Sequence, residues 1–149
     1  MTRKASGAED TAATLLRMAV GIIFIAHGWG KVVDVAGTAQ HFASLGIPEP
    51  HVMVYVAIAG EFVGGLGLLI GFLTRIAALG TLCTMLVAIM SVHLGHGLFA
   101  KNGGYEYPLV LALVSLFFVT HGARVFSVDA LLARADTPGF RSERVTSHA

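Results

Sequence analysis

Apolar residues dominate four long stretches of the chain, and short polar segments separate them. The stretches cover residues 11–29, 52–74, 76–100 and 107–123. A helix needs about 20 mostly apolar residues to cross a bilayer, within a range of about 17 to 25. Each stretch meets this length. Together they predict an all-α fold, a bundle of four transmembrane helices.

Two shorter segments beside these stretches predict helices that lie on the membrane surface. The segment 33–48 places Phe42 and Leu45 among polar residues, a pattern typical of an interfacial helix. Ser127 precedes the run Val-Asp-Ala-Leu-Leu, and an N-cap residue before an apolar run predicts a helix start. We therefore expect one short interfacial helix after the first span and another after the fourth.

The distribution of positive charge predicts how the chain is oriented. We expect a tail over residues 1–10, a membrane domain over 11–132 and a polar, disordered tail over 133–149. An even number of spans puts both termini on one side. That side holds all but two of the 10 Lys and Arg residues, the exceptions being Lys31 and Lys101. The positive-inside rule then predicts that both termini are cytoplasmic.

Composition excludes several other classes of protein. Hydrophobic residues make up 55% of the chain and charged residues 13%, whereas a soluble domain has about 25% charged residues. A formal net charge of +1 provides no basic surface for nucleic acid. Cys83 is the only cysteine, which excludes an internal disulfide and a CxxC motif. The partner that composition predicts is the lipid bilayer.

Ionisable residues inside the predicted spans are the candidates for function. A charged side chain at the centre of a membrane costs about 2.5 to 3.5 kcal/mol, so such a residue indicates a role by default. Glu61 lies roughly 3 Å from the midplane of its span, and His27 and His93 lie roughly 7.5 Å towards the outer face. Lys31, His96 and Glu106 lie further out. A bundle could gather these six side chains into one outward-facing polar cavity.

The helical spacing around Glu61 predicts which way it points. Glu61 shares a face with small residues such as Gly60 and Gly64, a pattern that packs against other helices. We expect the Glu61 carboxylate within hydrogen-bonding reach of a side chain from the first or third span. Gly60, Gly64 and Gly65 would leave room for a ligand ring beside it. The alternative is that Glu61 only clamps two helices together.

Arginines near the inner ends of the spans have a simpler interpretation. Arg17, Arg75 and Arg124 can extend their side chains to the inner headgroups, so we expect them to be structural or interfacial.

The histidines also raise the question of a metal or haem. His27 and His93 lie at one depth and could ligate haem, and with Glu61 they could bind zinc. However, the chain has no CxxCH motif, and an acid and a lysine lie beside these histidines. We therefore expect neither haem nor zinc.

Four motifs in order resemble one family. The first is the segment from Arg17 to Lys31, which ends in His-Gly-Trp-Gly-Lys. The second is Gly60-Glu61-Phe-Val-Gly-Gly followed by Leu-Leu-Ile-Gly-Phe-Leu-Thr-Arg75. The third is Gly104-Tyr-Glu106-Tyr-Pro-Leu, and the last is Ser127-Val-Asp129. Over residues 12–132 the chain resembles the DoxX family of small bacterial membrane proteins. One departure is His121-Gly-Ala-Arg-Val-Phe, where the family often has a Gly-x-Gly turn.

The resemblance implies a multi-pass protein of the bacterial inner membrane with four helices. Some relatives are subunits of thiosulfate:quinone oxidoreductase or partners of redox enzymes. Lys31, Glu61, Arg75 and Glu106 occupy motif positions in this chain. Ser127 and Asp129 close the family pattern, and we expect them to be structural or interfacial.

The first functional hypothesis is a membrane subunit of a redox system that binds a quinone or a similar small ligand. Glu61 and His27 would exchange protons as the catalytic pair, and Lys31 or His93 would donate a hydrogen bond to the ligand. Glu106 would contribute to the same binding site. No flavin, Fe–S or haem motif is visible, so a partner oxidoreductase would have to deliver electrons, and the chain alone would not be a complete enzyme.

Two alternatives belong to other classes. The chain could be a scaffold that anchors soluble redox or stress enzymes through its cytoplasmic surface and has no chemistry of its own. It could also be a small transporter. Four helices are few for alternating access, so a transporter would need a homo-oligomer.

Overall fold

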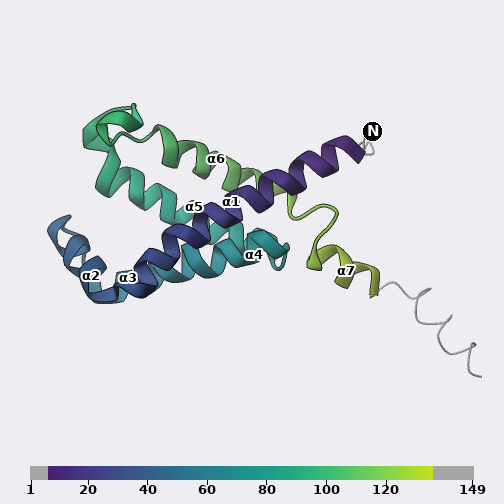
Figure 1. Cartoon of the computed structure of the whole chain (residues 1–149), viewed down its shortest axis with the longest axis horizontal. Coiled ribbons are helices and arrows are strands. Elements are labelled where there is room, and N and C mark those ends of the chain that lie inside the picture. Colours follow the sequence, from purple (N-terminus) through teal and green to yellow (C-terminus); the bar gives the residue numbers. More distant parts are fainter. Residues whose placement is uncertain (1–6, 136–149) are drawn as a thin grey trace, which may run out of the picture.

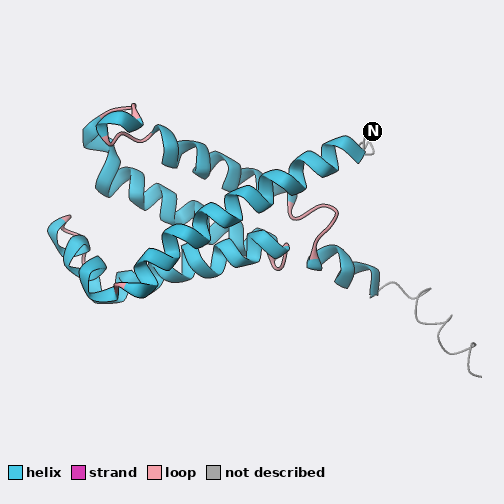
Figure 2. Ribbon diagram, in the orientation of Figure 1, coloured by secondary structure: helices cyan, strands magenta, loops and turns pink. Residues whose placement is uncertain are grey.

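The structure is a computed structural model that describes residues 7–135, and these residues form helices and connecting turns with no strand (Figures 1 and 2). The predicted all-helical class is therefore confirmed. The predicted tails fall partly on residues 1–6 and 136–149, which lie outside the described residues. The α-helices are α1 Gly7–Val33, α2 Val35–Ser44, α3 Pro50–Ile58, α4 Gly64–Ile70, α5 Thr74–Ala88, α6 Glu106–His121 and α7 Val128–Ala135.

Two π-helical segments join some of these helices into longer rods. The first, η1 (Ala59–Val63), connects α3 to α4, and the second, η2 (Ile89–His93), extends α5. Three helical segments of the described chain are therefore long and apolar enough to cross a membrane: Gly7–Val33, Pro50–Ile70 and Thr74–His96. The fourth apolar helix, α6, has 16 residues. It is about 24 Å long, against a hydrocarbon core of about 30 Å.

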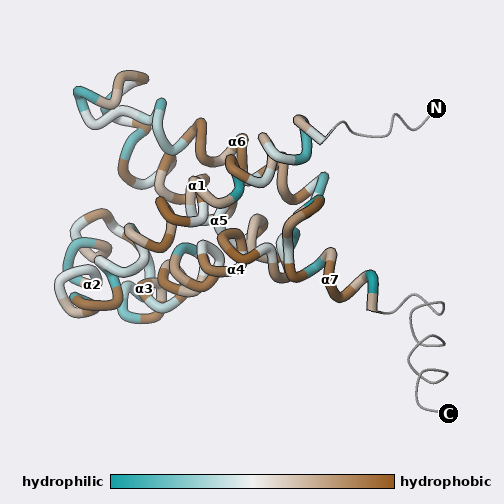
Figure 3. The backbone as a smooth tube through the Cα atoms, turned by 45° about the vertical axis from the view of Figure 1, so that its right-hand side comes forward, coloured by the Kyte–Doolittle hydropathy of each residue, from teal (hydrophilic) through white to brown (hydrophobic). Residues whose placement is uncertain are grey.

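The four rods alternate in direction along the chain. In Figure 1, the N-terminus, the α4–α5 turn, the end of α6 and helix α7 lie towards one end of the molecule. Helix α2 and the connection between α5 and α6 lie towards the other end. Figure 3 shows the more hydrophilic stretches mainly near these ends and hydrophobic residues along the rods between them.

Glycines allow α1 to approach the second rod closely. A Cβ on Gly21 would lie 2.7 Å from the Leu69 backbone nitrogen, and a Cβ on Gly65 would lie 2.8 Å from the Ile25 nitrogen. Further along, a Cβ on Gly28 would lie 2.5 Å from the Phe62 nitrogen. Close backbone approach of this kind is how helices pack in lipid, where the hydrophobic effect does not drive their association.

The turn between the second and third rods depends on left-handed backbone geometry. Gly71 ends α4 at φ 70°, and Leu73 precedes α5 at φ 46°. Glycine adopts this conformation without a steric penalty. The second predicted span therefore ends at Ile70, earlier than its predicted end at residue 74.

The third and fourth rods are held together by packing and by one buried hydrogen bond. Thr81 of α5 donates through its hydroxyl to the Ser115 hydroxyl of α6 at 2.9 Å, and both residues are fully buried. Apolar side chains from α1, α4, α5 and α6 form the core of the bundle. The core cluster consists of Val20, Phe24, Leu68, Ala78, Met85, Leu111, Ala112 and Phe118.

The predicted third span of residues 76–100 is too long at its C-terminal end. The helix stops at His96 because Gly97 turns the chain at φ 75°. A loop follows, with a short 3-10 turn over Ala100–Asn102, before α6 begins at Glu106. The two short helices that we expected beside the spans are present as α2 and α7.

Candidate functional site

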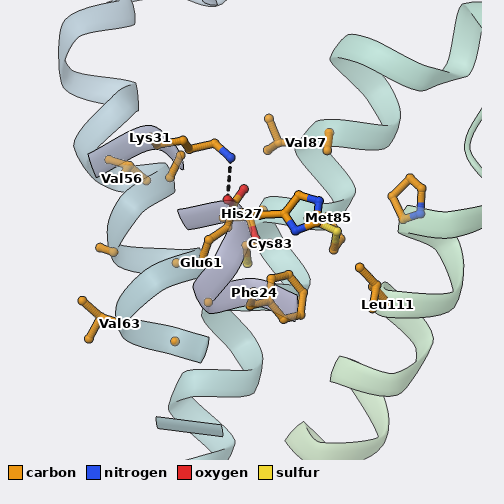
Figure 4. Close-up of a pocket in the computed structure, with 18 of the residues that line it drawn as sticks. Phe24, His27, Lys31, Val56, Glu61, Val63, Cys83, Met85, Val87 and Leu111 are labelled. Atoms are coloured by element: carbon orange, nitrogen blue, oxygen red, sulfur yellow. Dashed lines mark hydrogen bonds and ion pairs between the residues drawn. The ribbon is translucent and has the colours of Figure 1, made fainter. Parts of the chain in front are cut away.

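A cavity of about 970 Å³ opens among α1, α3, α5 and the start of α6 (Figure 4). Most of its walls are apolar. The polar side chains that line it come from α1, α2, η1, the α5–η2 rod and α6. They are His27, Lys31, His41, Glu61, Thr84, Ser91, His93 and Tyr107. A mostly apolar cavity with a few convergent polar groups is the usual form of a small-molecule site.

An ion pair between Lys31 and Glu61 is the main charged feature of this cavity. The Lys31 Nζ donates to Glu61 Oε2 at 2.5 Å, and the two side chains are 22% and 7% exposed. The pair is drawn as the dashed line in Figure 4. This contact confirms the expectation that Glu61 reaches a side chain of the first or third span.

The local structure explains why these two residues meet. Gly28 lets α1 approach the backbone of Phe62, the residue that follows Glu61. Lys31 comes three residues after Gly28 and therefore lies on the same face of α1. Lys31 is also in the last turn of α1, where the helix dipole favours a cation.

Two histidines line the same cavity and each has one ring nitrogen engaged. The Nδ1 of His27 donates to the Ile23 carbonyl at 2.9 Å, and the Nδ1 of His93 donates to the Gly103 carbonyl at 2.7 Å. A carbonyl can only accept, so Nδ1 carries the proton in both rings. When either ring is neutral, its Nε2 can accept a proton or a hydrogen bond from a ligand.

Both π-helical segments carry a residue of this site. Glu61 lies in the middle of η1, and His93 is the last residue of η2. π-turns are rare and occur frequently at functional sites, because the inserted residue changes the direction of the side chains around it. The apolar periodicity of the sequence did not predict either segment.

Four polar residues that the sequence did not indicate as ligand contacts also line the cavity: His41, Thr84, Ser91 and Tyr107. Tyr107 has its ring centroid 6.4 Å from that of His27, and its position at the start of α6 brings it to the cavity. His41 of α2 also lines the cavity. The sequence signal for Tyr107 was its place at a membrane boundary, where an aromatic residue needs no further role.

Glu106 does not line the cavity. Its Oε1 accepts a hydrogen bond from the Ala100 backbone nitrogen at 2.7 Å, so it fixes the loop between α5 and α6. His96 does not line the cavity either, so the expected grouping of six side chains reduces to four: Lys31, Glu61, His27 and His93.

The three glycines expected beside Glu61 act mainly in helix packing. A Cβ on Gly60 would collide with Thr84, and a Cβ on Gly64 would lie 3.1 Å from the Ala77 carbonyl oxygen. Both still border the cavity. Gly65 faces α1 and does not line the cavity, so the expectation that it leaves room for a ligand ring is wrong.

A second polar cluster lies at the other end of the rods and is built around Arg17. Its Nη1 donates to the Leu68 and Leu69 carbonyls at 2.5 and 3.1 Å, and its Nη2 donates to the Phe126 carbonyl at 2.8 Å. The residue is 1% exposed. The expectation that Arg17 reaches the headgroups is therefore wrong, because its guanidinium binds the open carbonyls at the end of α4.

Ser127 and Asp129 complete the cluster around Arg17. The Asp129 carboxylate accepts from the Leu73 and Thr74 backbone nitrogens at 2.8 and 3.0 Å, and so caps α5. The Ser127 hydroxyl accepts from the Ala130 nitrogen at 3.1 Å, as its predicted N-cap role requires. These contacts attach α7 to the α4–α5 turn.

The other two predicted structural arginines differ in burial. Arg124 forms an ion pair with Asp10 at 2.8 Å, which joins the end of α6 to the start of α1. Arg75 is exposed. Within residues 7–135, no group of three or more His, Cys, Asp or Glu side chains is arranged to hold a metal ion.

Comparison with known proteins identifies relatives. Residues 12–94 match the family described as DoxX. The chain is 34% identical over 125 residues to a Bacillus subtilis (strain 168) protein named "Putative oxidoreductase CatD", and the match covers 84% of this chain and 90% of that protein. It is 35% identical over 124 residues to the Escherichia coli (strain K12) "Inner membrane protein YqjF", covering 83% of this chain and 94% of the relative.

A shorter match involves a second Escherichia coli (strain K12) protein, "Inner membrane protein YphA". It is 35% identical over 80 residues, which cover 53% of this chain and 57% of that protein. No solved structure shows a significant match to the chain.

Proposed function

The chain belongs to the DoxX family and is a multi-pass protein of the bacterial inner membrane, and we propose that it is the membrane subunit of a quinone-linked redox system. The ligand would be a quinone, or a small molecule with similar carbonyl groups, in the cavity that Lys31 and Glu61 share. The observation that carries this proposal is the ion pair, with its buried carboxylate, in the wall of a large, mostly apolar cavity.

The residues present fit the head of a quinone. A quinone ring is apolar on both faces, which suits walls such as Phe24 and Met85. Its carbonyl oxygens need hydrogen-bond donors, and the Lys31 ammonium has two further protons beside the one directed to Glu61. His27 and His93 can supply further donors when they are protonated.

Reduction of a quinone to a quinol consumes two electrons and two protons. In our proposal the chain handles the protons: Lys31 holds a proton at the ligand oxygen, and Glu61 and His27 exchange protons as general acid and base. A partner oxidoreductase would supply the electrons. A relative carries the name oxidoreductase, which favours this assignment over a purely structural clamp.

The proposed orientation follows from the direction of the rods. We propose that α6 crosses the membrane as a fourth span despite its 16 residues, because it packs along the length of α5 and a bilayer can thin locally around a short helix. Both termini would then lie on the cytoplasmic side, with the inner cluster of Arg17 and Asp129. The cavity would open in the outer half of the membrane.

The experiment is extraction of the protein into nanodiscs, followed by mass spectrometry of bound small molecules and titration with a short-tailed quinone. Glu61→Gln is the test variant. Glu49→Gln is the control, because Glu49 is an exposed carboxylate at the start of the same rod. We expect wild type and Glu49→Gln to retain a quinone and to bind the added one, and Glu61→Gln to lose at least about tenfold in affinity.

Other outcomes would overturn the proposal. Equal quinone affinity in all three proteins would show that the ion pair does not contribute to quinone binding. Recovery of soluble enzymes with no small molecule, unaffected by Glu61→Gln, would favour the scaffold.

A further inference from the structure

The cavity continues beyond the polar groups as an apolar groove along the seam between the second and third rods. It follows two stripes of residues at helical spacing, one on each rod. We call this the seam groove, and its residues are Val63, Gly67, Ile70, Ile76, Gly80 and Cys83.

Contacts between the rods fix the direction of this groove. Gly60 packs against Gly80 and Thr84, and Gly64 packs against Ala77, so the two stripes run antiparallel towards the turn at Gly71. Ile70 comes nine positions after Glu61, which corresponds to about 14 Å along the helix. In the view of Figure 4, Cys83 lies below the Glu61 carboxylate in the direction of Phe24.

Chemistry divides the cavity into two parts. The charged and imidazole groups, Lys31, Glu61 and His27, lie at its outer end. The seam groove has no charged side chain, and its walls are open to the bilayer: Val63 is 60% exposed and Ile76 is 67% exposed. Gly67 and Gly80 have no side chain to fill the floor.

We propose that the seam groove holds a long aliphatic tail of the ligand, so that the ligand is a membrane-resident amphiphile that enters sideways from the bilayer. This inference rests on the proposed function and narrows its substrate class to quinones with long prenyl tails. The polar head would lie against Lys31 and Glu61, and the tail would run inward along the seam between α4 and α5.

The energetics set the size of the expected effect. A tail that leaves lipid for the groove gains no hydrophobic free energy, because lipid is as apolar as the groove. It gains dispersion contacts with the walls, and it orients the head towards the ion pair. The preference for a long tail should therefore be moderate.

The test compares two quinones with the same head, one short-tailed and one long-tailed, in nanodiscs of a single phospholipid. Quinone concentrations are expressed as moles of quinone per mole of lipid in the nanodisc. This removes the difference in how strongly the two quinones partition into the bilayer. Cys83→Trp fills the groove from its edge. Leu86→Trp is the matched control, because Leu86 is 48% exposed on the same helix and does not line the cavity.

We expect Cys83→Trp to lower the affinity for the long-tailed quinone about three- to tenfold. The affinity for the short-tailed quinone should stay within about twofold of the wild-type value. Leu86→Trp should affect neither. If both quinones bind wild type but Cys83→Trp changes them equally or not at all, the tail site is wrong and the head site stands. If neither quinone binds wild type, the proposed function itself fails.

A second readout uses the native thiol. Cys83 is exposed, so a membrane-permeable maleimide should alkylate it in the wild-type protein. The long-tailed quinone should slow this reaction. The short-tailed quinone, and extra phospholipid that lacks the quinone head, should not. Equal protection by phospholipid would mean that any lipid chain occupies the groove and would overturn the assignment to the ligand.

Discussion

Lys31 Nζ lies 2.5 Å from Glu61 Oε2, although the two residues belong to different rods and are 30 positions apart. Their contact depends on Gly28, which brings α1 against the backbone beside Glu61. It also depends on the π-turn that carries Glu61. One small residue and one local change of helix type therefore bring together the charged groups of the cavity.

The free energy that couples Lys31 to Glu61 can be measured with a double-mutant cycle. Lys31→Gln, Glu61→Gln and the double variant should show a coupling of about 0.5 to 2 kcal/mol in unfolding from detergent, because interhelical polar contacts in membranes are individually modest. Lys101→Gln combined with Glu61→Gln is the control, since Lys101 lies in the loop between α5 and α6, over the Phe99 ring. A coupling near zero for the first pair would contradict the ion pair.

Two glycines in α1 make a matched pair with opposite expected effects. A Cβ on Gly28 would collide with Phe62, so Gly28→Ala should lower the free energy of unfolding by about 1 to 3 kcal/mol. A Cβ on Gly30 would meet no other atom within 4 Å. Gly30→Ala should therefore be neutral or stabilise by up to about 1 kcal/mol, because alanine favours the helix.

Thermal unfolding in one detergent would measure both variants. Equal effects of the two substitutions would mean that α1 does not approach the second rod at Gly28. Because Gly28 also positions Lys31, Gly28→Ala should in addition weaken ligand binding, whereas Gly30→Ala should not.

Much of the fold could be predicted from the sequence because hydropathy and helix signals are local. The apolar lengths predicted the rods, and the Ser127 pattern predicted α7. The end of the third rod was missed, because residues 97–100 continue the apolar run while Gly97 breaks the helix through its backbone conformation.

The candidate site was predictable only in part. The depth of Glu61 indicated that it would find a polar partner, and Lys31 is that partner. Sequence spacing could not show that Glu106 lies outside the cavity. Its carboxylate binds a backbone nitrogen in an irregular loop, and such a contact leaves no pattern in the sequence. The role of Arg17 was missed for a related reason: its acceptors are carbonyls of residues more than 50 positions away.

Asp129 should control the start of the third rod. Asp129→Ala removes the acceptor for the Leu73 and Thr74 nitrogens, and loss of such a cap costs about 1 to 2 kcal/mol. Hydrogen exchange at these two amides should become faster, and the change should be smaller for Asp129→Asn. Arg134→Gln on the exposed part of α7 is the control. Unchanged exchange at Leu73 and Thr74 in Asp129→Ala would refute the cap.

Arg17 should be the residue whose loss most destabilises the end of the rods where α4 meets α7. Its guanidinium bridges the end of α4 and the segment before α7 by binding the Leu68, Leu69 and Phe126 carbonyls. Arg17→Met keeps an apolar chain of similar length but leaves buried carbonyls unpaired, so unfolding should become easier by about 2 to 4 kcal/mol. The free energy of unfolding of Arg17→Lys should lie between those of Arg17→Met and wild type. A single ammonium group cannot bind both segments as the planar, forked guanidinium does.

The matched control for Arg17 is Arg75, which is exposed near the same end of the rods. Arg75→Met should change the free energy of unfolding by less than about 1 kcal/mol, since an exposed arginine contributes little to stability. If Arg17→Met and Arg75→Met were equally mild, Arg17 would behave as an arginine at the headgroups, and the buried bridge would be refuted. If only Arg17→Met destabilises, and Arg17→Lys recovers part of the loss, the bridge between α4 and the approach to α7 explains why an arginine is tolerated inside the first rod.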